Sequence, residues 1–100
     1  MTDIRTAPAA RADLRNIRDY GKANFGPRVG RDYLDGLIRA FDRLAVRPMI
    51  GVAETRLGRG MRSFGYRSHR IFYLVEGDGL LIVRVLHQSR DVATTFGSVQ

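Results

Sequence analysis

Apolar residues recur every three or four positions along two stretches in the first half of the chain. The first series is Ala10, Leu14, Ile17, Gly21 and Phe25. The second series consists of Val29, Tyr33, Leu34, Leu37, Ile38, Phe41, Leu44 and Ala45. This spacing predicts two amphipathic helices, at about residues 9–25 and 28–47.

The ends of these helices carry local signals. Thr6 offers a side-chain cap to the first helix, and Pro8 falls in its first turn, where a missing N–H costs little. Gly26 and Pro27 end the first helix and begin the second. Because the link is so short, we expect an antiparallel helical hairpin.

The second half of the chain has the composition of strands. Runs of β-branched, aromatic and aliphatic residues predict strands at about 61–66, 69–75 and 80–87, and a shorter one is expected at 3–6. Glu76 to Gly79 contains two glycines that suit a tight hairpin turn. The sequence therefore predicts one α+β domain over residues 1–100, in the order β-α-α-β-β-β, with the helical hairpin packed on one face of a small antiparallel sheet.

Both faces of the 80–86 run are apolar, apart from Arg84. Such a strand is covered on both sides, and we expect something other than the two helices to cover the second face, which is a first indication of a partner. We expect residues 48–60 to form a loop, and residues 89–100 to form a short helical turn and a frayed tail. The residues expected to be largely buried are Leu14, Ile17, Leu34, Leu37, Ile38, Phe41, Ile71 and Tyr73.

The charge of the chain points to an anionic partner. The formal net charge is +7, and Lys22 is the only lysine among seventeen basic residues. Between Arg56 and Arg70 there are five arginines and no acidic residue, which predicts a local basic surface. Cysteine is absent, the start of the chain lacks an apolar signal segment, and the longest apolar run is too short to span a bilayer. We therefore expect a soluble, cytoplasmic protein without a membrane partner.

Five short motifs, in this order, resemble the ParE branch of the RelE/ParE toxin superfamily, the toxins of type II toxin–antitoxin systems that are also called plasmid stabilisation proteins. The motifs are Ala10-x-x-Asp13-Leu14-x-x-Ile17-x-x-Tyr20, Pro48-x-x-Gly51, Arg62-x-Phe64, His69-Arg70-Ile71-Phe72-Tyr73, and Arg84-Val85-Leu86-His87-x-x-Arg90-Asp91. The resemblance implies a helical hairpin on an antiparallel sheet and a hetero-oligomer with a cognate ParD-like antitoxin, whose C-terminal segment wraps the toxin. It also implies one of two targets. ParE-type members inhibit DNA gyrase, whereas RelE-type members cleave mRNA on the ribosome.

The residues available for RNA cleavage are Glu54, Arg62, Arg84 and His87. Glu54 and His87 are candidates for proton transfer, and the two arginines are candidates for holding phosphate. Relatives that cleave RNA use a late tyrosine or lysines as well, but this chain has no tyrosine after position 73 and no lysine after position 22. We therefore favour gyrase inhibition by binding, without catalysis. A ribosome-dependent mRNA endonuclease and a non-toxic, basic nucleic-acid-binding relative remain as alternatives.

For the gyrase reading, we expect the target to be contacted by Arg59, Arg62, Arg67, Arg70 and Arg90, with DNA contacted only indirectly. We expect no cofactor and no metal, because the two histidines have no carboxylates at ligand spacing. His69 is expected to be a surface or capping residue, and His87 to make a structural hydrogen bond. Asp91 is expected to pair with Arg84 or Arg90.

Overall fold

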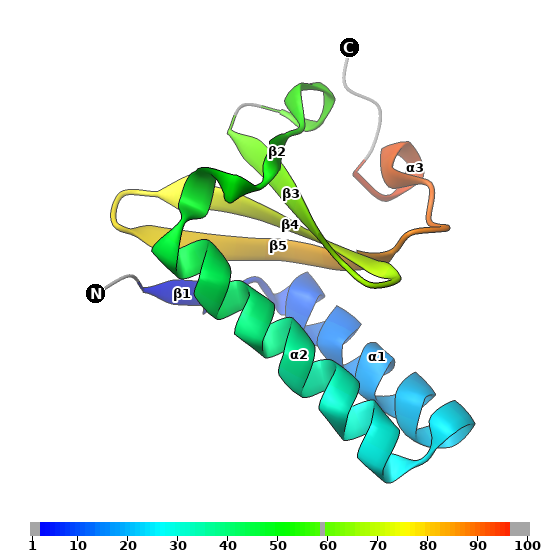
Figure 1. The fold of residues 1–100 in the computed structure, drawn as a ribbon. Helices are drawn as coiled ribbons and strands as arrows, with labels where there is room; N and C mark the ends of the chain where they lie inside the picture. Colours follow the sequence, from blue (N-terminus) through cyan, green and yellow to red (C-terminus); the bar gives the residue numbers. More distant parts are fainter. Residues whose placement is uncertain (1–2, 59, 97–100) are drawn as a thin grey trace.

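The computed structural model describes residues 3–58 and 60–96, and its main elements follow the predicted order, with one additional short strand after the second helix (Figure 1). The helices are α1 (Pro8–Phe25), α2 (Pro27–Val46) and the short α3 (Val92–Phe96). The strands are β1 (Ile4–Thr6), β2 (Val52–Ala53), β3 (Met61–Tyr66), β4 (His69–Glu76) and β5 (Gly79–His87). Two turns of 3₁₀ helix, η1 (Pro48–Ile50) and η2 (Thr55–Leu57), flank β2.

The five strands form one sheet in the order β1-β5-β4-β3-β2. The β3–β4 and β4–β5 pairs are antiparallel, as predicted, but β1 pairs with β5 in parallel, so the sheet is mixed. The predicted α+β fold is confirmed, and the sheet departs from the predicted antiparallel arrangement only at this edge. The two antiparallel helices return the chain to the side from which β1 started, so that β1 and β5 run in the same direction (Figure 1).

The helical hairpin forms where it was predicted. Pro8 and Pro27 begin α1 and α2, and Gly26 between them has a φ of 92°, which side chains other than glycine rarely adopt. The cap of α1 is Ala7, which makes no side-chain hydrogen bond, and Thr6 instead belongs to β1. The prediction that Thr6 caps the helix was therefore wrong. The strand continues to position 6 because its backbone is paired with β5.

The larger apolar core lies between the helical hairpin and one face of the sheet. Leu37, Phe41, Ile71 and Tyr73 are buried in it, as predicted. Leu14 and Ile17 are only partly buried and pack against the edge of this core, and Leu34 is also half-buried. The prediction for Ile38 was wrong, because it keeps 42% of its surface exposed. Apolar spacing places Ile38 on the border of the helical stripe, where the sheet no longer reaches it.

A smaller apolar core covers the opposite face of the sheet. Met61, Phe72 and Leu86 form it, and Val92 and Phe96 of α3 pack against it. The rings of Phe72 and Phe96 lie 5.2 Å apart between centroids. The chain itself therefore covers part of the face for which the sequence suggested a partner. The expected short helical turn is present as α3, whereas the frayed tail falls on residues 97–100, outside the described residues.

The segment predicted as a loop at 48–60 is more ordered than expected. β2 pairs with β3 at the far edge of the sheet, and the buried Tyr73 hydroxyl donates to the Pro48 carbonyl over 2.6 Å. The Tyr73 hydroxyl oxygen also accepts the Gly51 N–H over 3.0 Å. A buried hydroxyl needs such partners, and here they fasten η1 to the sheet. None of the helices in the described segments is long and apolar enough to cross a membrane.

Candidate functional site

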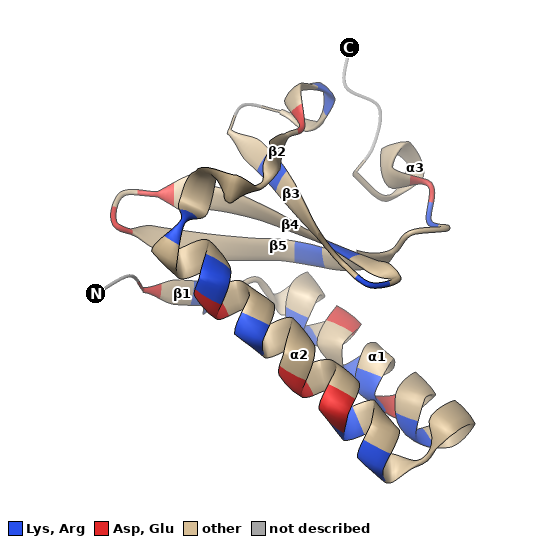
Figure 2. Ribbon diagram, viewed as in Figure 1, with Lys and Arg blue, Asp and Glu red and all other residues tan. Residues whose placement is uncertain are grey.

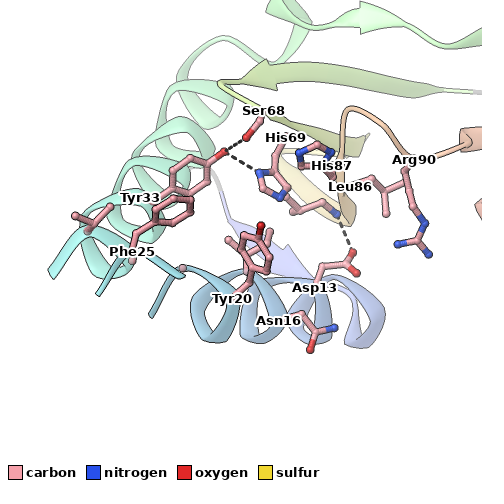
Figure 3. Close-up of a pocket in the computed structure, with 15 residues that line it drawn as sticks. Asp13, Asn16, Tyr20, Phe25, Tyr33, Ser68, His69, Leu86, His87 and Arg90 are labelled. Atoms are coloured by element: carbon pink, nitrogen blue, oxygen red, sulfur yellow. Dashed lines mark hydrogen bonds between the residues drawn. The ribbon is translucent and has the colours of Figure 1, made fainter. Parts of the chain in front are cut away.

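A cavity of about 590 Å³ lies where the helical hairpin meets the adjoining ends of β4 and β5 (Figure 3). One side is apolar and is formed by Ile17, Tyr20, Phe25 and Val29 of α1 and α2. The other side is polar and is formed by Asp13, Ser68, His69, His87 and Arg90. We call this cavity the histidine pocket. Its two sides give it the character of a binding site for an amphipathic group.

A contact between glycines shapes the apolar side of the pocket. Gly21 of α1 and Gly30 of α2 face each other, and a Cβ added at Gly30 would lie 2.8 Å from the backbone nitrogen of Lys22. The helices can therefore approach closely at this point. Tyr20 and Phe25 remain largely exposed beside the crossing, at 65% and 62% of their surface, with their rings in edge contact. Exposed aromatic groups at the rim of a cavity are typical of a contact surface for another molecule.

Two histidines form the polar wall. His69 and His87 are direct partners in the β4–β5 ladder, and their rings meet edge to face with centroids 5.3 Å apart. The Tyr33 hydroxyl lies 2.7 Å from Nδ1 of His69 and 3.1 Å from Oγ of Ser68 (Figure 3). His69 is therefore half-buried and bonded to α2. The prediction that His69 is a surface or capping residue was wrong, since the sequence did not reveal that Tyr33 lies opposite it.

The pKa of His69 is lowered from its ordinary value of 6.5. The main cause is burial, which disfavours the charged imidazolium, and repulsion from His87 acts in the same direction. The carboxylate of Asp13 opposes both effects. His69 is accordingly neutral at neutral pH. His87 lies at the exposed end of β5, and its Nδ1 accepts the Ser89 N–H over 3.1 Å. The expected structural hydrogen bond of His87 is confirmed.

Asp13 of α1 joins the pocket to the edge of the sheet. Its two carboxylate oxygens accept Nε and one terminal nitrogen of Arg84, over 2.7 and 2.8 Å. One of these oxygens also accepts the Val85 N–H over 2.9 Å. The side-chain hydrogen bonding to Asp13 raises the pKa of Arg84; burial opposes this with a smaller effect, and the negative charge of Asp13 acts in the same direction as the hydrogen bonding. Asp91 makes no salt bridge with either Arg84 or Arg90 within the described residues, so the expectation that it pairs with one of them was wrong.

A β-bulge explains why Arg84 reaches α1. Tyr73 pairs with Ile82 while the preceding Phe72 pairs with Arg84, so that β5 has one extra residue at Val83. A bulge changes the direction of the side chains that follow it. Asp91, in turn, accepts the N–H groups of Ala93 and Thr94 and the Thr94 hydroxyl. It caps α3, and these hydrogen bonds lower its pKa.

The four candidates for RNA cleavage each have a different partner. Glu54 accepts the Ser63 hydroxyl over 2.5 Å, and Ser63 in turn accepts Nε of Arg70 over 2.8 Å. Arg62 donates to the Met49 and Gly51 carbonyls over 3.1 and 2.7 Å. Arg84 is paired with Asp13, and His87 with Ser89, as described above. The structure places Glu54 and Arg62 near β2, and His87 at the opposite end of the sheet, beside the β3–β4 turn (Figure 1).

The predicted target-binding arginines are also spread over several elements (Figure 2). Arg67 lies in the β3–β4 turn at a φ of 50°, with its guanidinium 5.7 Å from the centre of the Tyr66 ring. Arg90 lies at the same end of the sheet, because the Gln88 N–H donates to the Ser68 carbonyl. Arg62 and Arg70 make the internal hydrogen bonds just described. Arg59 lies outside the described residues.

Sequence reasoning missed the roles of Tyr33 and Asp13 at this site. Both had been noted only as members of helical or family patterns, and neither pattern shows which strand residue faces them. It also gave no role to the exposed apolar residues around η1 and β2, at the other end of the hairpin, which are Val46, Met49, Ile50 and Val52. Within residues 3–58 and 60–96 there is no cluster of three or more histidine or acidic residues that could hold a metal ion.

Comparison with known proteins identifies the family. The family model described as the ParE toxin of the type II toxin–antitoxin system parDE matches residues 4–92. Toxin ParE1 of Mycobacterium tuberculosis is 41% identical over 87 residues, covering 86% of this chain and 89% of that protein. Toxin ParE3 of Caulobacter vibrioides is 29% identical over 94 residues, covering 94% of this chain and 93% of the relative.

A solved structure shows the same fold. The chain from the chromosomal ParDE TA system of P. aeruginosa superposes with a TM-score of 0.75 at 19% identity, over 87% of this chain and 96% of that one. The match confirms the arrangement of a helical hairpin on a five-stranded sheet. Together with the family model and the 41% identical relative, it confirms the resemblance first seen in the five motifs. The chain belongs to the ParE toxin family of type II toxin–antitoxin systems.

Proposed function

We propose that this chain is a toxin that inhibits DNA gyrase by binding and is neutralised by a cognate ParD-like antitoxin. The observation that carries the first part is the internal use of three of the four groups that RNA cleavage would need. Arg84 is paired with Asp13, Arg62 is held by two backbone carbonyls, and Glu54 accepts the Ser63 hydroxyl. General acid–base catalysis needs groups that are free to exchange protons beside the reacting atoms. Inhibition by binding needs no such groups.

The target contact is proposed to centre on Arg67 and Arg90. Both are exposed and lie at the end of the sheet that also carries His87. Arg67 has an uncommon positive φ for a residue with a side chain, a feature often found at functional turns. Arg59, Arg62 and Arg70 were also predicted as contacts. Of these, Arg62 and Arg70 have internal partners, so we expect them to support the surface more than to reach the target.

An antitoxin partner is supported by the P. aeruginosa relative, which comes from a ParDE system, and by the surface of this chain. The histidine pocket has an apolar side with exposed aromatic groups at its rim, and the chain has a net charge of +7. We expect the antitoxin to place an amphipathic, acidic segment in this pocket. A segment placed there would lie beside Arg90, so that neutralisation would follow from competition with the target.

The experiment adds purified, antitoxin-free protein to a gyrase supercoiling assay and, in parallel, to translating ribosomes. We expect loss of supercoiling with intact mRNA. Arg67→Gln and Arg90→Gln should weaken the inhibition, whereas Arg39→Gln, at an exposed position of α2, should not. Codon-specific mRNA cuts that disappear in Glu54→Ala or His87→Ala would establish the endonuclease alternative.

The absence of any response in both assays would favour the non-toxic relative. The antitoxin is tested separately, by co-purification of the two proteins through a high-salt wash. An interface with an apolar centre should survive that wash, whereas binding through phosphate contacts alone weakens steeply with salt. A toxin that elutes alone, with no neighbouring gene for such an antitoxin, would contradict this part of the proposal.

A further inference from the structure

The histidine pair is arranged so that one nitrogen of each ring is available to a ligand. In both rings the hydrogen bonds within the described chain use Nδ1, which meets the Tyr33 hydroxyl in His69 and Ser89 in His87. These bonds fix the orientation of the rings and leave Nε2 of each ring without a hydrogen-bond partner among the described residues, and both histidines line the pocket. Figure 3 shows the two rings beside each other, with the Tyr33 hydroxyl on one side.

The charged and titratable groups around the pair come from every element packed on it. They are Asp13 and Tyr20 from α1, Tyr33 from α2, Tyr66 from β3, Arg84 from β5, and Arg90 from the segment after β5. Asp13 is the only acidic residue among them, and Arg84 neutralises it through two hydrogen bonds. Arg90 therefore leaves the polar side of the pocket positively charged even when both histidines are neutral.

Burial and the neighbouring ring keep His69 neutral in the empty pocket, because its pKa is lowered. An anion placed against Nε2 would reverse this balance, since an opposite charge within about 4–6 Å favours the charged imidazolium. Protonated His69 could then donate Nδ1–H to the Tyr33 oxygen and Nε2–H to the anion, so both ring nitrogens would be satisfied. An apolar group in the same position would bury His69 further and favour the neutral ring still more.

We propose that the histidine pocket takes a carboxylate side chain of the antitoxin against His69, His87 and Arg90, and that binding takes up a proton from solvent onto His69. This inference rests on the proposed function, because it assumes that the antitoxin occupies the pocket. It specifies the chemistry of the contact as an acidic side chain flanked by apolar ones. It also makes the affinity of the complex depend on pH in a defined direction.

The sign follows from proton linkage. If the complex binds more protons than the separate partners, affinity increases as pH falls from about 7.5 to about 5.5, a range in which histidine titrates and exposed carboxylates stay charged. A difference of about one pKa unit between the free and bound states of one histidine corresponds to a tenfold change in affinity. We therefore expect the antitoxin to bind about threefold to tenfold more tightly near pH 5.5 than near pH 7.5.

The test is calorimetric titration of the intact toxin with the antitoxin encoded beside it, across this pH range. Repeating each titration in buffers of different ionisation enthalpy counts the protons taken up. His69→Asn keeps a polar group in reach of the Tyr33 hydroxyl, and this variant and His87→Asn should each reduce the proton uptake. The double variant should abolish it, because the chain has only two histidines. Arg90→Gln should weaken binding at every pH and leave the pH dependence in place, and Arg39→Gln should change neither.

Several results would overturn the inference. Affinity that is constant over the range, or that falls with falling pH, excludes a carboxylate at the histidine pair, and the second result indicates an apolar contact instead. A pH dependence that persists in the folded double variant, checked by circular dichroism, would place the proton elsewhere. If the toxin binds no antitoxin at any pH, the proposed function fails together with the inference, whereas binding without proton uptake removes the inference alone.

Discussion

The contact between Asp13 and Arg84 gives the most direct test of how the helical hairpin is held on the sheet. Substituting Asp13→Ala removes both acceptors of the Arg84 guanidinium and the acceptor of the Val85 N–H. The salt bridge is largely shielded, since the side chains of Asp13 and Arg84 keep only 11% and 22% of their surface exposed. The substitution therefore leaves a partly buried cation and a backbone donor without their partners.

The expected cost follows from these two losses. Breaking a buried ion pair by removing one partner costs about 3–5 kcal/mol, and the remaining solvent contact of Arg84 reduces this figure. An unsatisfied backbone donor adds about 1–3 kcal/mol where water does not reach it. We expect Asp13→Ala to lower the free energy of unfolding by about 3 kcal/mol, and Asp13→Asn, which can still accept one or two hydrogen bonds, by about half as much.

The assay is urea denaturation of the two Asp13 variants, of Arg84→Met, and of the double variant Asp13→Ala/Arg84→Met. In the double-mutant cycle we expect a coupling energy of about 2 kcal/mol, because Arg84→Met also removes the unpaired charge. Asp19→Asn is the matched control on the same helix, since Asp19 pairs with Arg18 at the surface, where such pairs contribute little. If Asp13→Asn costs no more than Asp19→Asn, the reasoning is refuted.

Three further results are expected. Tyr73→Phe should lower the free energy of unfolding by about 1–3 kcal/mol in urea, because the carbonyl of Pro48 and the N–H of Gly51 lose their buried partner; an unchanged midpoint would contradict this role. Gly30→Ala should lower the free energy of unfolding by about 1–3 kcal/mol in the same assay, because the added Cβ meets the backbone of α1. An unchanged free energy would mean that the two helices move apart at little cost. Because the pKa of His69 is lowered in the folded chain, the unfolded chain binds the proton more readily. The free energy of unfolding should therefore be highest above about pH 6.5 and decrease as the pH falls below it. Thermal melts of His69→Asn should lack this decrease.

The sequence predicted the elements well because their signals are local. Helical spacing and the prolines at 8 and 27 placed α1 and α2 to within a residue or two of their observed ends. The glycines at 77 and 79 marked the β4–β5 hairpin, and Gly77 has the positive φ that the turn requires. β2 was missed because two paired residues give no periodic signal.

The site was harder to predict, because its contacts join residues far apart in the chain. Tyr33 and His69 are 36 positions apart, and Asp13 and Arg84 are 71. The bulge at Val83 decides the second contact, and it arises from the pairing register of β4 and β5. Neither composition nor spacing encodes which residues oppose each other across a sheet, so the sequence indicated a polar strand end but not its partners.

The sequence also did not show which arginines are exposed and able to bind a target. Charge counting placed Arg62 and Arg67 in one basic segment, yet their surroundings differ. Arg62 donates hydrogen bonds to two backbone carbonyls, those of Met49 and Gly51. Its buried Nε has no hydrogen-bond partner within the described part of the chain. The Arg62 guanidinium therefore stabilises the segment of η1 and β2. Arg67 lies five residues later, exposed in a turn beside Tyr66. Arg67 has one internal hydrogen bond, a 3.3 Å contact from its Nε to the Tyr66 hydroxyl at the surface. A cation that satisfies two backbone carbonyls gives up more to bind a target than one that gives up a single long, exposed hydrogen bond and water. The proposed target surface therefore centres on Arg67 and Arg90, beside the pocket to which we assign the antitoxin.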